Sequence, residues 1–367
     1  MSLRLHRVLF IFPPEIAHQI AFAILRFLQP ILTLFGSHKL DRSAYLQLRK
    51  CEAIYFKNRV GLAAGLDKNA DSFLALSKLG FGFIEIGSIT AKESKGNTGE
   101  VLERLVNKEA LVNRLGLPNI GVDKFYENFK NKKLREDVVY GVNIAKTNDK
   151  NILRDKAIED FLYSFEKIYL LNNIDYIALN ISCPNTEDGK TFEGPKDLKV
   201  LLGEIRKREG YIVKENNIKL KPVLVKISPD LRILELEKLI EVSEDYSIYG
   251  YIVGNTSKIR GFVGYENKID GGISGKPIGD LSTAVITEVY SLTKGEKLII
   301  GCGGIFDAND AYEKLKAGAN LIQLYTSLVY QGPSVVNSIN KELMKAAIKN
   351  IRKNNLDSII KATRSIY

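Results

Sequence analysis

The sequence predicts an α/β protein, a closed (β/α)8 TIM barrel preceded by a helical extension. After residue 50, eight short β-branched or apolar runs alternate with longer charged segments of helical character. Strands that alternate with helices form parallel βαβ units, and eight such units close into a barrel. The extension is predicted by residues 16–35, where Arg26 carries the only formal charge.

Composition limits the possible functions. The chain has 367 residues, 45% of them hydrophobic, and a formal net charge of +10. A basic protein suits nucleic acid, an anionic membrane or an acidic substrate. No zinc spacing, RNP-like pattern or basic helix is present, so we expect no nucleic-acid partner. Three cysteines argue against a disulfide framework, and we find no metal-ligand cluster. The three histidines all precede residue 40, so the barrel must use a general base of another type.

The N-terminal segment is expected to be a helical hairpin that lies on a membrane surface. Pro13-Pro14-Glu15 is typical of a helix start, and Pro30 is expected to split the segment into two short helices. Nine Lys and Arg against three acids in residues 1–60 suit an anionic leaflet. Packing on the main domain alone and a membrane span are the alternatives, but Arg26 and Pro30 argue against a span. We find no signal-peptide cleavage site.

The predicted strands are residues 60–64, 83–86, 140–144, 176–180, 223–227, 249–254, 298–301 and 321–324. In a barrel, functional residues follow the C-terminal ends of the strands. Small, amide and lysine residues recur there: Lys68, Ser88, Asn143, Asn180, Lys226, Asn255, Gly303-Gly304 and Tyr325-Thr326. Most such residues are ordinary turn formers, but asparagine near the ends of three strands favours a site. The rival fold, an open doubly wound sheet, would carry a glycine-rich fingerprint where residues 64–68 read AGLDK.

Two glycine-rich loops indicate a phosphate site. Residues 301–304 (GCGG) follow the seventh predicted strand, and residues 271–275 (GGISG) follow the sixth. Glycine lets backbone N–H groups approach a phosphate closely. In (β/α)8 barrels, the loops after the last two strands commonly bind a phosphate with such N–H groups. Thr326, after the eighth strand, can add a hydroxyl group.

A family resemblance rests on motifs spread over nearly the whole chain. They are residues 61–68 (GLAAGLDK), 84–88 (IEIGS), 113–116 (NRLG), 141–144 (GVNI), 180–186 (NISCPNT), 225–230 (VKISPD), 254–256 (GNT), 271–277, 301–305 and 323–326 (QLYT). In this order they resemble the dihydroorotate dehydrogenases. The helical extension is similar to that of the quinone-linked membrane class, which the soluble class lacks.

The resemblance implies oxidation of dihydroorotate to orotate in pyrimidine biosynthesis, with FMN in the barrel mouth and a membrane quinone as final acceptor. By motif position, FMN is expected to contact Ala64, Gly65, Leu66, Asp67, Lys68, Ser88, Asn143, Asn180, Lys226, Gly254, Gly275, Gly304, Tyr325 and Thr326. Substrate is expected to contact Lys68, Asn113, Arg114, Leu115, Gly116, Leu117, Asn180, Asn185, Asn255 and Thr256. The quinone path is expected to pass His18, Arg104 and Tyr325. Asparagine amides suit the edge of a cyclic imide, and Lys226 can stabilise negative charge that develops on the flavin ring.

The base position is where the sequence departs from the membrane class. That class usually has serine there and the soluble class cysteine, and this chain has Cys183. Strand alternation points Ser182 and Cys183 to opposite sides, so we assign the base to Cys183. A thiol with a pKa of about 8.5 ionises far more easily than an alkyl hydroxyl. We expect activity to rise with pH through a thiol-like pKa and alkylation to inactivate. Cys51 and Cys302 are expected to be inert.

Residues 96–104 (GNTGEVLER) lack prolines and an additional arginine that the family tends to carry before Arg104, so the quinone path is expected to be shaped differently. We assign residues 1–45 to membrane association and quinone entry and residues 46–367 to the FMN-binding barrel, peripheral on the inner face of the cytoplasmic membrane. Three rival functions stay open at this point. One is a soluble-type enzyme that uses fumarate or NAD, which Cys183 favours. The second is a phosphate-binding barrel lyase or isomerase with Lys68 or Lys226 as Schiff-base lysine. The third is a non-catalytic membrane module.

Overall fold

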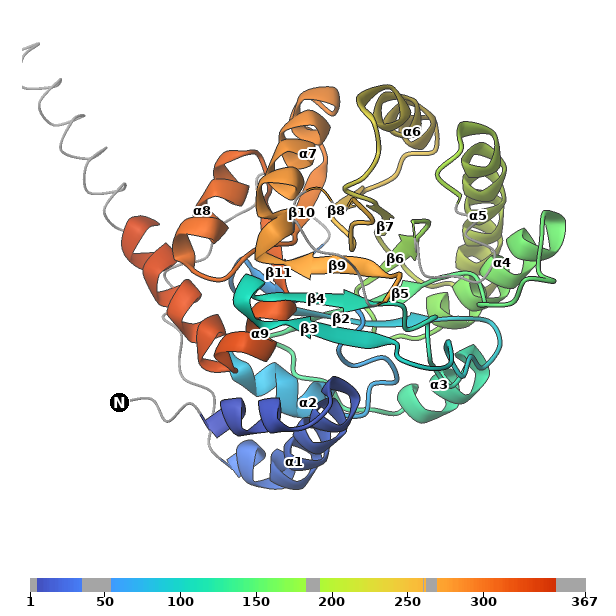
Figure 1. Ribbon diagram of the computed structural model, residues 1–367. Helices are drawn as coiled ribbons and strands as arrows, with labels where there is room; N and C mark the ends of the chain where they lie inside the picture. Colours follow the sequence, from blue (N-terminus) through green and yellow to red (C-terminus); the bar gives the residue numbers. More distant parts are fainter. Residues whose placement is uncertain (1–4, 35–53, 183–191, 260, 262–268, 348–367) are drawn as a thin grey trace, which may run out of the picture.

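Eight parallel strands close into a barrel, as the alternating pattern predicts (Figure 1). The computed structural model describes residues 5–34, 54–182, 192–259, 261 and 269–347. The barrel strands are β1 (Val60–Leu62), β2 (Phe83–Ile89), β5 (Val139–Ile144), β6 (Tyr176–Asn180), β7 (Val223–Ile227), β8 (Gly250–Val253), β10 (Leu298–Cys302) and β11 (Leu321–Leu324). β1 pairs with both β2 and β11, which closes the ring. All eight predicted strands are present, with ends shifted by a few residues.

Helices surround the barrel on its outside (Figure 1). They are α2 (Phe73–Leu76), α3 (Val122–Phe129), α4 (Asp155–Tyr169), α5 (Pro195–Asn216), α6 (Ile233–Asp245), α7 (Gly279–Leu292) and α8 (Ala308–Lys316), followed by α9 (Thr326–Gln331) after the last strand. α4 illustrates the packing, because Phe161, Phe165 and Ile168 repeat at helical spacing and are fully buried. The main hydrophobic core therefore lies between the strands and this helical layer.

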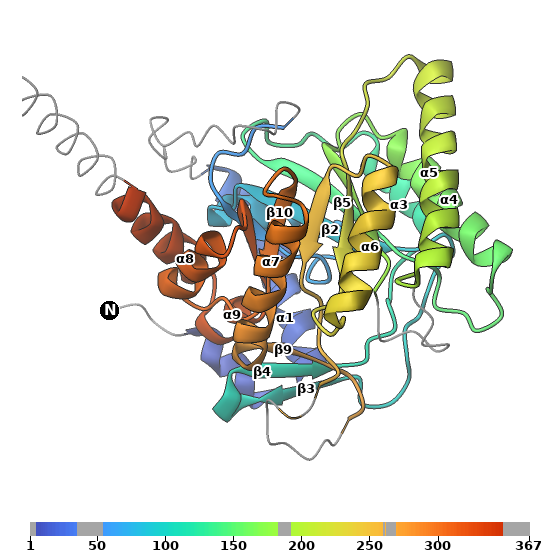
Figure 2. The same ribbon diagram turned by 90° about the horizontal axis from the view of Figure 1, so that it is seen from above.

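A small antiparallel sheet, which the sequence did not reveal, lies over one end of the barrel (Figure 2). Its strands are β3 (Leu102–Leu105) and β4 (Ala110–Asn113), from the connection after β2, and β9 (Gly272–Gly275), from the connection after β8. Both connections leave the C-terminal ends of barrel strands, so this sheet roofs the mouth where functional residues are expected.

The barrel interior changes from apolar to polar along its axis. Its floor is a cluster that includes Phe56, Phe83, Tyr176 and Leu298. Glycines make room for the rings, since a Cβ on Gly141 would lie 2.0 Å from the Tyr176 ring. Residues two positions further along the strands have the same orientation and are polar, among them Glu85, Asn143, Lys226 and Gln323, all at least 95% buried. This polar layer lies directly beneath the mouth.

The N-terminal residues form a short 3-10 helix, η1 (Leu5–Ile11), and one continuous helix, α1 (Pro14–Leu34), which contacts α2 and β3. The predicted break at Pro30 is wrong. A proline removes one backbone hydrogen bond, and the remaining bonds carry the helix through it. Among the described helices, none is both long enough and apolar enough to cross a membrane.

Candidate active site

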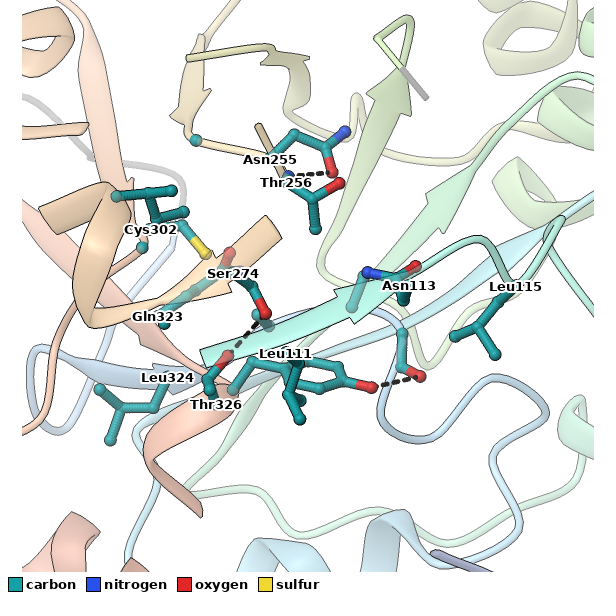
Figure 3. A pocket seen from close by; sticks show the side chains of 18 of the residues that line it. Leu111, Asn113, Leu115, Asn255, Thr256, Ser274, Cys302, Gln323, Leu324 and Thr326 are labelled. Carbon is teal, nitrogen blue, oxygen red and sulfur yellow. Dashed lines mark hydrogen bonds between the residues drawn. The ribbon is translucent and has the colours of Figure 1, made fainter. Parts of the chain in front are cut away.

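One cavity occupies the barrel mouth beneath the small sheet. It encloses about 1130 Å³ of space between protein atoms, part of it open to solvent. Figure 3 shows side chains from several elements pointing into it: Asn113 from β4, Asn255 and Thr256 after β8, Ser274 from β9, and Thr326 after β11. The Thr326 hydroxyl donates to Ser274 Oγ at 2.9 Å, which ties the barrel to the small sheet.

Most residues predicted to bind FMN or substrate line this cavity. They are Ala64, Gly65, Lys68, Ser88, Asn113, Leu115, Gly116, Leu117, Asn180, Lys226, Gly254, Asn255, Thr256, Gly275, Gly304, Tyr325 and Thr326. Four others do not line it. Asn143 lies in the polar layer below, Leu66 lines a neighbouring cavity, and Arg114 donates to Thr98 O at 3.3 Å. The Asp67 carboxylate accepts the backbone N–H groups of Asp71 and Ser72, both at 2.9 Å. Cys183 and Asn185 lie outside the described residues, as does Cys51.

Three backbone segments converge on one side of the cavity. Gly304, after β10, has φ +72°, and a Cβ there would lie 2.3 Å from Gly279 Cα at the start of α7. Gly275, at the end of β9, has φ +103° and lies against the backbone of Glu109 and Ala110. No other residue fits Gly304 without strain. The result is a side-chain-free cradle beside a helix N-terminus, the arrangement that binds phosphate.

Unsatisfied polar atoms in the cavity wall point to a ligand with hydrogen-bonding groups. Gln323 Oε1, Thr256 Oγ1 and Ser327 Oγ are buried and have no hydrogen-bond partner in the described protein. Buried polar atoms are rarely left unpaired, because each costs about 1–3 kcal/mol. The cradle and these atoms together fit a phosphorylated, hydrogen-bonding cofactor.

Lys68 supplies positive charge at the cavity. Its ammonium group donates to Gly65 O at 2.7 Å, and burial lowers the pKa of Lys68 to about 8. A bound anion would stabilise the charged form against this desolvation. The location therefore suits a bound carboxylate or phosphate, which would stabilise the ammonium charge.

Asn97 holds the connection that carries Asn113 to Leu117. Its side-chain amide donates to Arg114 O at 2.7 Å, and its backbone N–H donates to Leu115 O at 3.0 Å. Asn148 Nδ2 donates to Asn97 Oδ1 at 3.1 Å. Side-chain amides of Asn97 and Asn148 therefore fix the loop that faces the cavity.

A second cavity adjoins the first beneath α1 and η1. Tyr325, Leu102 and Leu111 line both cavities, so they form the boundary between them. Its other walls are apolar side chains of η1, α1, α2, α9 and the segments beside them, apart from His18 and Arg104. All three residues predicted for the quinone path therefore line it.

Arg104 and His18, which both line this second cavity, make different contacts. Arg104 donates to the carbonyls of Leu9 at 3.4 Å and Phe10 at 3.3 Å, and also to Phe12 O. It thereby fixes the end of η1 to β3. The His18 ring lies 4.4 Å from the Phe22 ring, and burial, with Lys68 nearby, lowers the pKa of His18 to about 4. His18 is therefore neutral at physiological pH.

Several residues of the site were not predicted from the sequence. Ser274, Ser327 and Gln323 line the cavity, and Cys302, expected to be an inert core residue, also lines it (Figure 3). Burial raises the pKa of the Cys302 thiol, which keeps it protonated. Glu85, which lies beneath the cavity, was also not predicted as a functional residue. The detectable signal was an acid in the otherwise apolar run 83–86, in register with Phe83 on the inward face.

Comparisons with known proteins agree with this geometry. A sequence model described as dihydroorotate dehydrogenase matches residues 47–346. The chain belongs to the dihydroorotate dehydrogenase family. The dihydroorotate dehydrogenase (quinone) of Christiangramia forsetii is 39% identical over 344 residues, covering 93% of this chain and 97% of that protein. The enzyme of the same description from Aromatoleum aromaticum is 37% identical, with 90% and 91% covered.

Solved structures of the family have the same architecture. The crystal structure of DHODH from Eimeria tenella in complex with ferulenol matches with a TM-score of 0.77 at 29% identity, and the match covers 92% of each chain. The ligand-free form of that protein gives a TM-score of 0.78 at 28% identity, covering 92% of this chain and 96% of that one. The predicted barrel and family are confirmed. Members of this family generally use a flavin.

Proposed function

We propose that the protein oxidises (S)-dihydroorotate to orotate in pyrimidine biosynthesis, with FMN as its cofactor and a membrane quinone as final electron acceptor. One observation carries the proposal: a cavity that holds amide, hydroxyl and lysine side chains and a phosphate cradle shares Tyr325, Leu102 and Leu111 with a cavity that is almost wholly apolar. A flavin between a polar substrate and an apolar acceptor needs both environments, side by side.

The residues around the polar cavity match the substrate chemically. Dihydroorotate is a cyclic imide with a carboxylate, and the amides of Asn113, Asn180 and Asn255 offer donors and acceptors for the imide edge. Lys68 suits the carboxylate because its charge is otherwise poorly solvated. FMN, when bound, accepts the hydride. Ser88, Lys226, Gly254, Gly275, Gly304 and Thr326 line the space that would hold it, and Asn143 supports them from below.

We assign the proton abstraction to Cys183. The thiolate takes a proton from one ring carbon while a hydride leaves the neighbouring carbon, and the electron pair freed by deprotonation forms the ring double bond. Ser182, the preceding residue, is buried and donates to Lys226 O at 3.1 Å, so it is held back from the role of base. Cys183→Ala is expected to lower kcat by at least about 100-fold, because general base catalysis contributes about that much.

We further propose that residues 1–45 attach the protein to the inner face of the cytoplasmic membrane and that residues 46–367 form the FMN-binding unit. Large apolar side chains are exposed on η1 and α1, among them Ile11 at 79% and Phe27 at 77%. Such side chains favour an interfacial position. Phe27→Ser is expected to weaken sedimentation with anionic vesicles, whereas Tyr211→Ser, on the far helix α5, leaves it unchanged. Equal binding of both variants and the parent would contradict the attachment.

The absorption spectrum of the purified protein tests the reaction. We expect a yellow protein whose flavin bands bleach when dihydroorotate is added without oxygen and return when a quinone is added. A colourless protein would favour the lyase or isomerase, and a yellow protein that dihydroorotate leaves unbleached would exclude the proposed substrate.

A further inference from the structure

Glu85 is a fully buried carboxylate at the centre of the polar layer. Its exposed fraction is 0%, and its two oxygens meet donors from four other barrel strands. Asn143 Nδ2 donates to Oε1 at 2.9 Å, and the Lys226 ammonium lies 3.6 Å from the same oxygen. Tyr176 OH donates to Oε2 at 3.1 Å, and Gln323 Nε2 donates to it at 2.8 Å.

The carboxylate can only accept from these neighbours. Lys226 is a pure donor, and burial together with the nearby Glu85 charge raises the pKa of Tyr176, so the phenol keeps its proton. A charged group without water is maintained only when its lone pairs and its charge are satisfied, which three hydrogen bonds and the Lys226 ion pair achieve here. Any amide next to Glu85 must therefore present its NH2 end.

This requirement passes along a chain of hydrogen bonds into the cavity. With Asn143 Nδ2 fixed on Glu85, Asn143 Oδ1 faces Ser88, whose hydroxyl donates to it. The hydroxyl has one proton, so it must accept from its other neighbour, and Asn180 Nδ2 donates to Ser88 Oγ at 3.1 Å. Asn180 Oδ1 then faces Asn255 Nδ2 at 3.4 Å. Each link leaves the next amide a single orientation.

This series of hydrogen bonds ends in the part of the cavity where substrate is expected to bind. Asn255 Nδ2 also donates to Ser182 Oγ at 3.1 Å, and Asn255 Oδ1 accepts the Thr256 N–H at 2.9 Å. Asn180 and Asn255 both line the cavity. An imide edge carries N–H and C=O groups in a fixed order, so an amide turned by 180° would oppose donor to donor. Buried mismatches of this kind discriminate strongly between ligands.

We propose that Glu85 is a positioning residue that sets the amide polarity of Asn143, Asn180 and Asn255 and thereby the hydrogen-bond pattern offered to the pyrimidine ring. This inference rests on the proposed function, because the ring read by these amides is that of dihydroorotate. An alternative is that Glu85 only holds the strands together, in which case its loss would weaken all ligands alike.

The test is Glu85→Gln in the flavin-loaded protein, with Tyr176→Phe as the matched control. Glutamine is close to glutamate in shape but can donate as well as accept, so Asn143 loses its fixed orientation. Tyr176→Phe removes a donor from the other oxygen and leaves the amide chain intact. Calorimetric titration measures the affinity for orotate and for orotate methylated at its imide nitrogen. The ratio of the two is the discrimination.

We expect Glu85→Gln to weaken orotate binding by about 10- to 100-fold, the range for a lost hydrogen bond to a polar partner, and to reduce the discrimination. Tyr176→Phe should stay within about threefold of the parent for both ligands. Unchanged orotate affinity in Glu85→Gln, or an equal loss for both ligands, would overturn the proposal. Glu85→Asp, which keeps the charge, should recover part of the discrimination.

If Glu85→Gln fails to fold, variants of Ser88 test the same series of hydrogen bonds one step closer to the cavity. Ser88→Thr retains the hydroxyl relay and Ser88→Ala removes it, so their discrimination ratios should differ, and equal ratios would overturn the proposal. The parent protein separates this inference from the proposed function. If the parent protein binds no orotate, the proposed function is wrong. If the parent binds orotate and Glu85→Gln retains full discrimination, only the proposed role of Glu85 is wrong.

Discussion

The two adjoining cavities are built by opposite means. The barrel mouth is organised by hydrogen bonds, with Glu85 buried beneath it and amides oriented above. The cavity under α1 is organised by shape, since apolar side chains form its wall and Arg104 is engaged by η1 carbonyls. The difference shows a division of labour. Under the proposed function, directional hydrogen bonds would recognise the polar substrate, and the apolar cavity would accept a hydrophobic electron acceptor with less discrimination.

The largest expected effect comes from removing the charge partner of Glu85. Lys226→Met leaves a buried carboxylate without its cation and should lower the free energy of unfolding by about 3 kcal/mol. Urea denaturation of the flavin-free protein measures it. The control Lys207→Met breaks an exposed pair with Glu204 and should change stability by less than about 0.5 kcal/mol. Equal stability of both variants would show that charge pairing does not organise the barrel mouth.

The next effect concerns acid stability at the apolar cavity. The pKa of His18 is about 4 in the folded protein against an ordinary value of 6.5, so the unfolded chain binds more protons between these two pH values. Stability is therefore lost as pH falls from 6.5 to 4, by on the order of 2 kcal/mol after allowance for partial exposure. Denaturation at pH 7 and pH 4.5 should show that His18→Phe loses less than the parent. An identical loss in both would mean that the His18 side chain of α1 is not buried in the wall of the apolar cavity.

A smaller effect separates the two half-reactions. Arg104→Ala frees three carbonyls of the η1 region and should lower turnover with quinone by about tenfold, in line with charged hydrogen bonds. Bleaching of the flavin by dihydroorotate, which depends on the other cavity, should keep its rate. Stopped-flow measurements of both steps check this. An equal loss in both steps would deny that the cavities act separately.

The smallest expected effect is a pH dependence of ligand binding. Lys68 has a pKa of about 8, so its charge is present below that pH and is lost as pH rises through it. Orotate affinity should fall by about fivefold between pH 7 and 9 if Lys68 holds the carboxylate. Lys68→Arg keeps its charge throughout and should flatten the profile. A fall of equal size in Lys68→Arg would assign the effect to another group.

The sequence predicted the barrel because its eight strands are short, apolar and regularly separated by helical segments. It did not predict β3, β4 and β9, because four-residue strands within loops carry no clear period and β4 pairs with β9 about 160 residues away. The predicted break at Pro30 failed because one lost hydrogen bond does not end a helix. The two misses have different causes: tertiary pairing decides the three short strands, whereas the local cost of one proline was overestimated in α1.

The site, too, was predicted only in part. Residues at strand ends, such as Asn180, Asn255 and Lys226, were found because barrel geometry gathers them in one place. Glu85 was not singled out, since its importance depends on donors from four other strands that no local pattern brings together. Arg104 was predicted for the quinone path, but its bonds to η1 required the structure.

The choice of electron acceptor tests the account most directly, because it asks whether the apolar cavity completes the reaction begun in the polar one. Dihydroorotate oxidation should be measured with a short-chain quinone, fumarate and NAD at equal concentration. The account predicts that quinone supports the fastest turnover and that Arg104→Ala slows only that reaction. Faster turnover with fumarate or NAD than with quinone would contradict it.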